Sequence, residues 1–99
     1  MANSVTVSGM VVTPVHELKT LFDHDYLNFR VKADAGKGSD IFVAVNVYSY
    51  TQIKLAKDRG LKKGDRVWVQ GELMARMTND SGHDVIEVRA LQLDPVKEV

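Results

Sequence analysis

The feature that most constrains the fold is an alternation of apolar and polar side chains with a period of two residues. It is clearest in 26–34, where every second residue from Leu27 to Ala33 is apolar and the residues between them are polar. Because successive side chains of a β-strand point to opposite faces of a sheet, this pattern predicts a strand with one buried face. Further runs alternate in the same way at 4–12, 41–48, 66–77 and 84–93. The chain is therefore expected to be mainly β-structure.

Several of these runs contain an interruption. Gly9 and Gly71 lie in the middle of the first and fourth runs, and each favours a bulge or a sharp bend in its strand. In the last run, Leu91 and Leu93 break the parity of the preceding apolar residues, which predicts another bulge there. The segment 13–25 fits either a continued strand or a covering loop.

One stretch, 51–59, has helical character. Ser49 or Thr51 can cap its start and Gly60 can close its end. The resulting order is strand, strand, strand, helix, strand, strand. This order predicts an all-β OB-fold, a five-stranded Greek-key barrel with one short helix between strands 3 and 4. An antiparallel sandwich is the alternative.

Size and composition limit the classes of function. With 99 residues the chain has room for one core, so we expect residues 1–99 to form a single domain. Lys+Arg and Asp+Glu both number 13, and the formal net charge of zero argues against gripping nucleic acid by bulk positive charge. The lack of cysteine excludes disulfides and thiolate metal sites. Since neither a signal-peptide pattern nor a membrane-length apolar run is present, we expect a cytoplasmic protein.

The sequence contains no pattern that is typical of catalysis. His16, His24 and His83 lack paired-ligand spacing, which predicts solvated histidines rather than a metal site. The segment 36–38 lacks the length and the Ser or Thr of a nucleotide-binding loop. We therefore expect a binding protein rather than an enzyme, without a metal, a cofactor, a small-molecule substrate or a membrane partner.

Aromatic and basic side chains occur together at positions that the alternation places outside the barrel. These candidates are Arg30, Lys32, Phe42, Asn46, Tyr48, Trp68 and Arg76, with Lys37 in a neighbouring loop. The combination is typical of proteins that bind single-stranded nucleic acid, because bases stack on aromatic rings and Lys or Arg contacts the phosphates. The alternative is that the rings pack against a partner subunit or beneath 13–25.

Two segments carry a resemblance to a known family. The strand Phe42–Tyr48 has an aromatic residue at each end, and after a helix come the turn Leu61–Asp65 and the strand Val67–Leu73. Together they resemble the bacterial single-stranded DNA-binding protein family, which has a turn of the form hydrophobic, basic, basic, Gly, Asp/Ser before a V-aromatic-V-x-G-x-L strand. Residues 5–11 and 27–31 look like the first two strands of that family, so the likeness covers nearly the whole chain.

The resemblance implies an OB-fold, sequence-tolerant binding of single-stranded DNA in replication, recombination or repair, and assembly into homo-dimers or tetramers. It places Phe42 and Tyr48 at the family's stacking positions, and Trp68 at an aromatic position of its fourth strand. Two other stacking positions fall on Met77 and within 35–37, so we expect fewer stacking platforms. The family's long tail with an acidic tip is not in this sequence, which fits either a shortened chain or a tail-less relative such as a phage, plasmid or primosomal form.

A second function stays open at this point. An OB-fold subunit for primosome assembly or protein interaction would bind nucleic acid only weakly. The neutral net charge and the missing platforms favour this alternative, whereas the Phe42 and Tyr48 pair favours DNA binding.

Overall fold

The computed structural model describes residues 3–34, 41–77 and 84–96, and within them the side chains of 3–34, 41–74 and 87–94. The elements are β1 (Val5–Val11), β2 (His16–Lys19), β3 (Asp25–Ala33), β4 (Ile41–Val47), α1 (Tyr50–Asp58), β5 (Arg66–Met77) and β6 (Asp84–Val96). Each predicted strand is present within a few residues of its expected bounds, and the helix begins one residue earlier than predicted.

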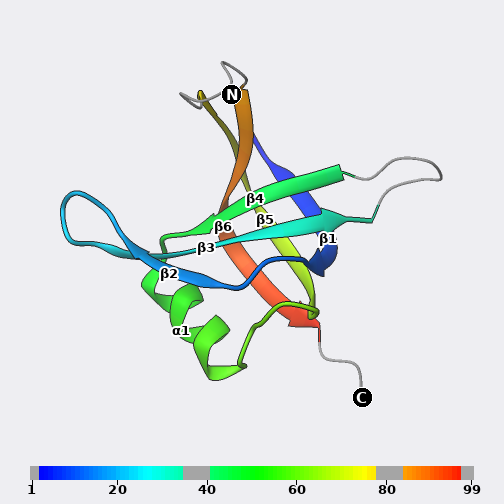
Figure 1. The fold of residues 1–99 in the computed structure, drawn as a ribbon, viewed down its shortest axis with the longest axis horizontal. Helices are drawn as coiled ribbons and strands as arrows, with labels where there is room; N and C mark the ends of the chain where they lie inside the picture. The colour runs from blue at the N-terminus through cyan, green and yellow to red at the C-terminus, as the bar shows by residue number, and fades with distance from the viewer. Residues whose placement is uncertain (1–2, 35–40, 78–83, 97–99) are drawn as a thin grey trace.

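The strands form a closed barrel (Figure 1). The sheet order is β1-β5-β6-β4-β3-β2, and an additional pairing between β1 and β3 closes it. β4 and β6 run parallel, whereas the other pairs are antiparallel. A closed barrel of strands with one helix is consistent with an OB-fold and differs from the two-layered sandwich that was the alternative.

The open question about 13–25 is settled by β2, which forms a hairpin with β3. The turn of this hairpin extends away from the barrel (Figure 1). Because β2 adds a strand to the count, α1 follows the fourth strand, although it occupies the residues at which the helix was predicted. Ser49 caps α1 by accepting a hydrogen bond from the backbone N–H of Gln52, and Gly60 follows its end with a φ of 64°.

Both central glycines lie where two backbones come into close contact. A Cβ at Gly9 would stand 2.1 Å from the carbonyl oxygen of Lys32, at the point where β1 passes from β5 to β3. A Cβ at Gly71 would stand 2.0 Å from the carbonyl oxygen of Arg89. The β5–β6 register shifts at Gln70/Gly71, where Gln70 pairs with Gln92 and Gly71 with Ala90. Leu91 is therefore the extra residue, and the bulge predicted in this strand is confirmed.

The alternation predicts the core well. The buried residues form one hydrophobic cluster: Val7, Val11, Leu27, Phe29, Val31, Val45, Val47, Ile53, Ala56, Leu61, Val67, Val69, Val88, Ala90 and Leu93. Two residues that the alternation places on the inner side of their strands are exposed instead. Ile41, 50% exposed, pairs with Ala33 on the last rung of the β3–β4 ladder, and Leu73, 44% exposed, lies beyond the point where β1 stops covering β5. Parity sets the direction of a side chain, but neighbouring strands decide whether it is covered.

Among the described residues, no helix is long and apolar enough to cross a lipid bilayer.

Candidate nucleic-acid interface

The outer surface of β3 and β4 brings most of the predicted site residues together. Phe42, Asn46 and Tyr48 share one parity on and just after β4, and Arg30 and Lys32 share the corresponding parity on β3. Inward neighbours such as Phe29 and Val45 are fully buried, which fixes this opposite side as the outer one. We call this surface, with its residues Tyr26, Arg30, Lys32, Phe42 and Tyr48, the β3–β4 face.

Phe42 stands at one end of the face with 56% of its surface exposed. Its cross-strand neighbour is Lys32, which pairs in turn with Met10 on β1. An uncovered ring beside an exposed ammonium group provides a stacking surface next to a phosphate contact. The prediction that the Phe42 ring lies outside the core is confirmed.

Tyr48 stands at the other end of the face, about 20 Å from Phe42 along an extended chain. It is half-buried because its ring stacks on Tyr26 of β3, with ring centroids 5.0 Å apart and an interplanar angle of 25°. Its backbone carbonyl lies 2.9 Å from Nε2 of His24. Tyr48 is therefore held by one contact of its ring and one contact of its main chain. Sequence reasoning missed Tyr26, although its parity with Asn28 and Arg30 places it on the outer side of β3.

Arg30 lies on β3 between the two aromatic ends, opposite Ala44. Its side chain is exposed and makes no ion pair with another described residue. Arg66, by contrast, is paired with Asp34. Ala44 has only a methyl side chain and does not cover Arg30. Arg30 can therefore contact a phosphate that passes between the aromatic ends.

Asn46 does not have the exposure that the alternation predicts, since only 4% of its surface is accessible. Its side-chain Oδ1 accepts a hydrogen bond of 2.7 Å from Asn28, and its Nδ2 donates one of 2.8 Å to Glu87 of β6. The predicted exposure of Asn46 is therefore wrong: the side chain points to the outer side, but polar groups of the flanking strands cover it. We interpret Asn46 as a residue that connects β3, β4 and β6 beneath the DNA-binding candidates.

Replacing Asn46 by alanine is expected to lower the free energy of unfolding by about 1–3 kcal/mol, because the buried Glu87 carboxylate and Asn28 lose a hydrogen-bonding partner. Chemical denaturation measures this loss, and Gln70→Ala, which removes an exposed amide from β5, is the matched control. Unchanged stability together with weaker DNA binding would instead identify Asn46 as a direct contact.

The remaining predicted residues lie elsewhere or outside the description. Trp68 is half-buried on β5, opposite Ser8 and Asp94, and β6 separates its strand from β4. It is therefore not part of the β3–β4 face. Lys37 and the side chain of Arg76 lie outside the residues that the structure describes.

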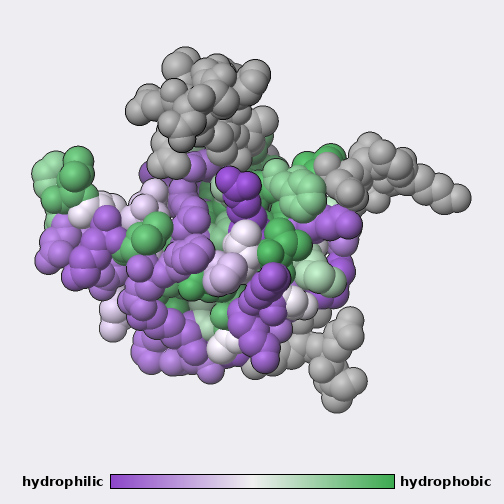
Figure 2. Space-filling model, in the orientation of Figure 1, coloured by the Kyte–Doolittle hydropathy of each residue, from purple (hydrophilic) through white to green (hydrophobic). Residues whose placement is uncertain are grey.

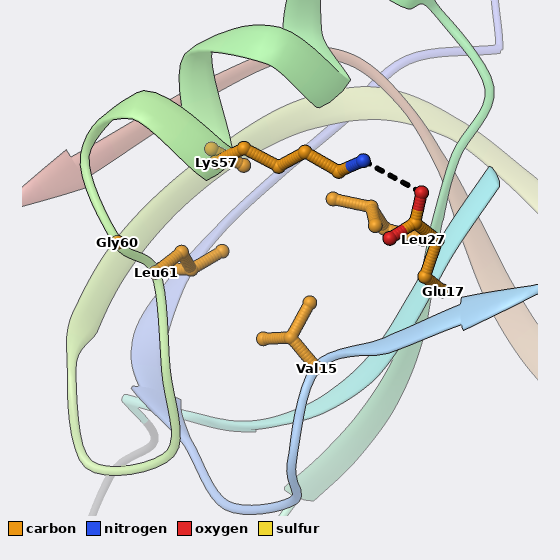
Figure 3. Close-up of a pocket in the computed structure, with 7 residues that line it drawn as sticks. Val15, Glu17, Leu27, Lys57, Gly60 and Leu61 are labelled. Atoms are coloured by element: carbon orange, nitrogen blue, oxygen red, sulfur yellow. Dashed lines mark hydrogen bonds and ion pairs between the residues drawn. The ribbon is translucent and has the colours of Figure 1, made fainter. Parts of the chain in front are cut away.

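A pocket on the opposite side of the β2–β3 hairpin is separate from this face. It has a volume of about 230 Å³ and lies between β2 and α1, with apolar walls from Val15, Leu27, Ala56 and Leu61 (Figure 3). At its edge, the Nζ atom of Lys57 donates a hydrogen bond of 2.6 Å to Glu17. This hydrogen bond raises the pKa of Lys57. The pair therefore contributes to stability at neutral pH, and that contribution is lost as the pH rises through the raised pKa.

No cluster of three or more potential metal ligands is found among the residues described. His24 contacts the carbonyl of Tyr48, as noted above, and so has a structural partner. The arrangement on the β3–β4 face supports stacking and ionic contacts, which require neither a metal nor a nucleophile.

Comparisons with known proteins give matches among solved structures but none among family models or curated sequences. No protein-family model and no curated protein sequence matches the chain. Solved structures match it over nearly their full length. The second single-stranded DNA-binding protein of Mycobacterium smegmatis is 27% identical, with a TM-score of 0.73 and coverage of 100% of this chain and 98% of that one.

Two further structures share the fold. A Plasmodium falciparum single-stranded DNA-binding protein, solved in complex with single-stranded DNA, is 20% identical, with a TM-score of 0.77 and coverage of 98% and 96%. The dimeric N-terminal domain of PriB from Thermoanaerobacter tencongensis is 22% identical, with a TM-score of 0.74 and coverage of 97% and 98%. The likeness found in the sequence is thus confirmed at the level of the fold: the chain has the same β-barrel fold as these proteins over nearly its whole length.

Proposed function

We propose that this protein binds single-stranded DNA without regard to sequence and without a catalytic step of its own. The observation that carries the proposal is the β3–β4 face, on which the exposed Phe42 and the stacked pair of Tyr26 and Tyr48 flank Arg30 and Lys32. Support also comes from the fold, which is shared with a protein solved in complex with single-stranded DNA.

The mechanism rests on stacking with help from a few charges. Every base has a flat face that can lie on an aromatic ring, so stacking tolerates any sequence. The phosphates between two stacked bases would meet Arg30 and Lys32, whose side chains are exposed on the same surface. This division of roles suits a chain whose formal net charge is zero, because little of the affinity has to come from bulk charge.

The direct test is a mobility shift or fluorescence anisotropy measurement with labelled oligo(dT). An oligonucleotide of about 20 nucleotides exceeds the roughly 4–16 nucleotides that one OB-fold occupies. The proposal expects saturable binding of the single strand and little binding of a duplex of the same length. Equal binding of both would argue for an unspecific electrostatic contact.

A shallow salt dependence is expected as well. Contacts from Arg30 and Lys32, with Lys37 and Arg76 as further candidates, predict a slope of log K against log salt between about −1.5 and −3 for a single strand. Titrations from low to high salt measure this slope. A slope steeper than about −6 would show that phosphate contacts dominate and that stacking is not the main source of affinity.

The proposal extends to the rest of the sequence-based prediction. Residues 1–99 would act as one DNA-binding domain built on a five-stranded Greek-key OB barrel, in the cytoplasm, as a homo-oligomer. A protein-interaction role is the second candidate. It is favoured by Leu21 and Phe22, which are 100% and 93% exposed at the tip of the β2–β3 hairpin.

A further inference from the structure

The hairpin carries an open sheet edge. Among the described strands, β2 pairs only with β3, and all four of its residues are exposed. An edge of this kind presents unpaired N–H and C=O groups that can pair with another strand. Neither proline nor a bulge interrupts β2.

The hydrogen bonds of the hairpin show which residues direct their backbone groups to this edge. The Thr20 N–H donates to the carbonyl of His24. Thr20 and His24 are therefore a hydrogen-bonded pair of the antiparallel ladder. Such pairs recur every two residues, which assigns Leu18 and His16 to bonds with β3. The backbone groups of Glu17 and Lys19 therefore point away from β3, toward the open edge.

We propose that a second copy of this chain pairs with the open edge, β2 against β2 in antiparallel orientation, about a two-fold axis at Leu18. In this register the backbone of Glu17 pairs with that of Lys19 of the second copy, and the axis repeats the contact in reverse. Opposite charges then face each other twice. The neighbouring symmetric registers would place Glu17 against Glu17, or Lys19 against Lys19, and like charges directly opposite are unfavourable. Within one copy Glu17 is already paired with Lys57, and Lys19 with Asp23 and Asp25. Each contact between copies therefore adds a second partner to an existing ion pair and favours this register over its neighbours.

Apolar side chains on the hairpin fit the same pairing. Leu18, 41% exposed, meets its own copy across the axis, where the side chains of a non-hydrogen-bonded pair come closest. Leu21, in the turn two residues beyond β2, lies at the same end of the pairing as Val15 of the second copy, and Val15 forms a wall of the pocket beside α1 (Figure 3). Figure 2 shows the hydrophobic surface at the end of the projecting hairpin, where Leu21 and Phe22 are almost fully exposed.

Hydrogen bonds order the backbone of the turn before any partner binds. The Thr20 hydroxyl accepts hydrogen bonds from the backbone N–H groups of Phe22 and His24, and the Thr20 carbonyl accepts one from Asp23. Lys19 is ion-paired with Asp23 at 3.2 Å. An ordered apolar tip loses little conformational freedom on association.

The pairing would also join two DNA-binding surfaces. Leu18 pairs with Tyr26 across the β2–β3 ladder, so Leu18 and the aromatic pair lie on the same side of the sheet. Two copies joined at Leu18 would form one continuous sheet with an aromatic pair on each side of the axis. This inference specifies the interface of the proposed homo-oligomer, and it is tested without DNA, so its failure would leave the DNA-binding proposal intact.

The test is the mass in solution, measured by sedimentation equilibrium over a range of protein concentrations. The full chain is expected to self-associate, and Leu18→Lys, which places two ammonium groups at the axis, is expected to reduce the mass to about half. Leu91→Lys is the matched control, because Leu91 is 55% exposed on β6, away from the hairpin. A monomeric wild type, or equal masses for wild type and Leu18→Lys, would overturn the proposal.

A charge exchange tests the charge pairing across the edge separately. Glu17→Lys makes the edge wholly basic and Lys19→Glu makes it wholly acidic, so each variant alone should lose self-association through like-charge repulsion. Mixed in equal amounts, they should form a heterodimer, because both contacts are then complementary. Circular dichroism establishes that each variant is folded. Two folded variants that fail to associate when mixed would contradict the proposed charge pairing across the edge.

Discussion

Replacing Tyr48 by alanine will weaken the binding of oligo(dT) by about 5- to 150-fold, the equivalent of one stacked base or roughly 1–3 kcal/mol. The loss has two sources, since the variant removes a ring that a base can stack on and also leaves Tyr26 without its neighbour 5.0 Å away. Anisotropy titrations at fixed salt measure the change. Phe42→Ala is expected to cause a loss of the same size, because Phe42 is an uncovered ring at the other end of the face.

The two aromatic ends should act independently of each other. Phe42 and Tyr48 are about 20 Å apart along β4, and changes at sites more than about 7–10 Å apart usually add in free energy. The Phe42→Ala/Tyr48→Ala double variant should therefore lose the product of the two single effects. Tyr26→Ala/Tyr48→Ala should lose less than the product, because these rings form one stacked unit.

Tyr50→Ala provides the control for these variants. Tyr50 is 77% exposed at the start of α1, so the substitution removes an equally accessible ring outside the β3–β4 face. Its affinity should match that of the wild type. If Tyr50→Ala weakened binding as much as Tyr48→Ala did, or if neither Phe42→Ala nor Tyr48→Ala had an effect, DNA would not lie on the β3–β4 face.

Replacing Gly71 by alanine is expected to lower the free energy of unfolding by about 3 kcal/mol, a large effect for a single methyl group. The new Cβ would stand 2.0 Å from the carbonyl oxygen of Arg89, and a backbone atom inside a strand pair cannot move aside as a flexible side chain can. For a domain of this size, such a loss lowers Tm by roughly 12–24 °C. Thermal unfolding monitored by circular dichroism measures it.

The matched control for Gly71→Ala is Gly60→Ala. Gly60 has a φ of 64° but no atom within 4 Å of a Cβ built on it, so the substitution tests backbone conformation without a steric clash. Its expected cost is only about 1 kcal/mol. Equal stability losses at the two positions would show that β5 and β6 are not in close contact at Gly71.

The local pattern of this sequence predicts some features of the barrel very well. The change of parity at Leu91 and Leu93 predicted a bulge, and in the structure Leu91 is the extra residue while Leu93 is 1% exposed. This worked because the strand period is a property of neighbouring residues. The hairpin strand β2 could not be predicted in the same way, because 13–25 has no clear period and its pairing partner, β3, had to be known first.

In the candidate site, too, the local pattern predicts some properties while the tertiary structure decides others. Phe42 and Asn46 have equivalent positions in the alternation of β4, yet Phe42 is 56% exposed and Asn46 only 4%. The difference comes from Glu87, which is distant in sequence and reaches Asn46 only because β6 lies beside β4 in the barrel. The contribution of Tyr26 likewise depends on its contact with Tyr48 across the β3–β4 ladder.

The sequence by itself determined the five longer strands and the side of the sheet that each of their side chains takes, because both follow from a two-residue period that is local to the chain. Only the tertiary structure decided which outward side chains are accessible, that two tyrosines form one stacked unit, and that β2 is left with an open edge. These properties depend on which distant strands become neighbours when the barrel closes, and no local pattern contains that information.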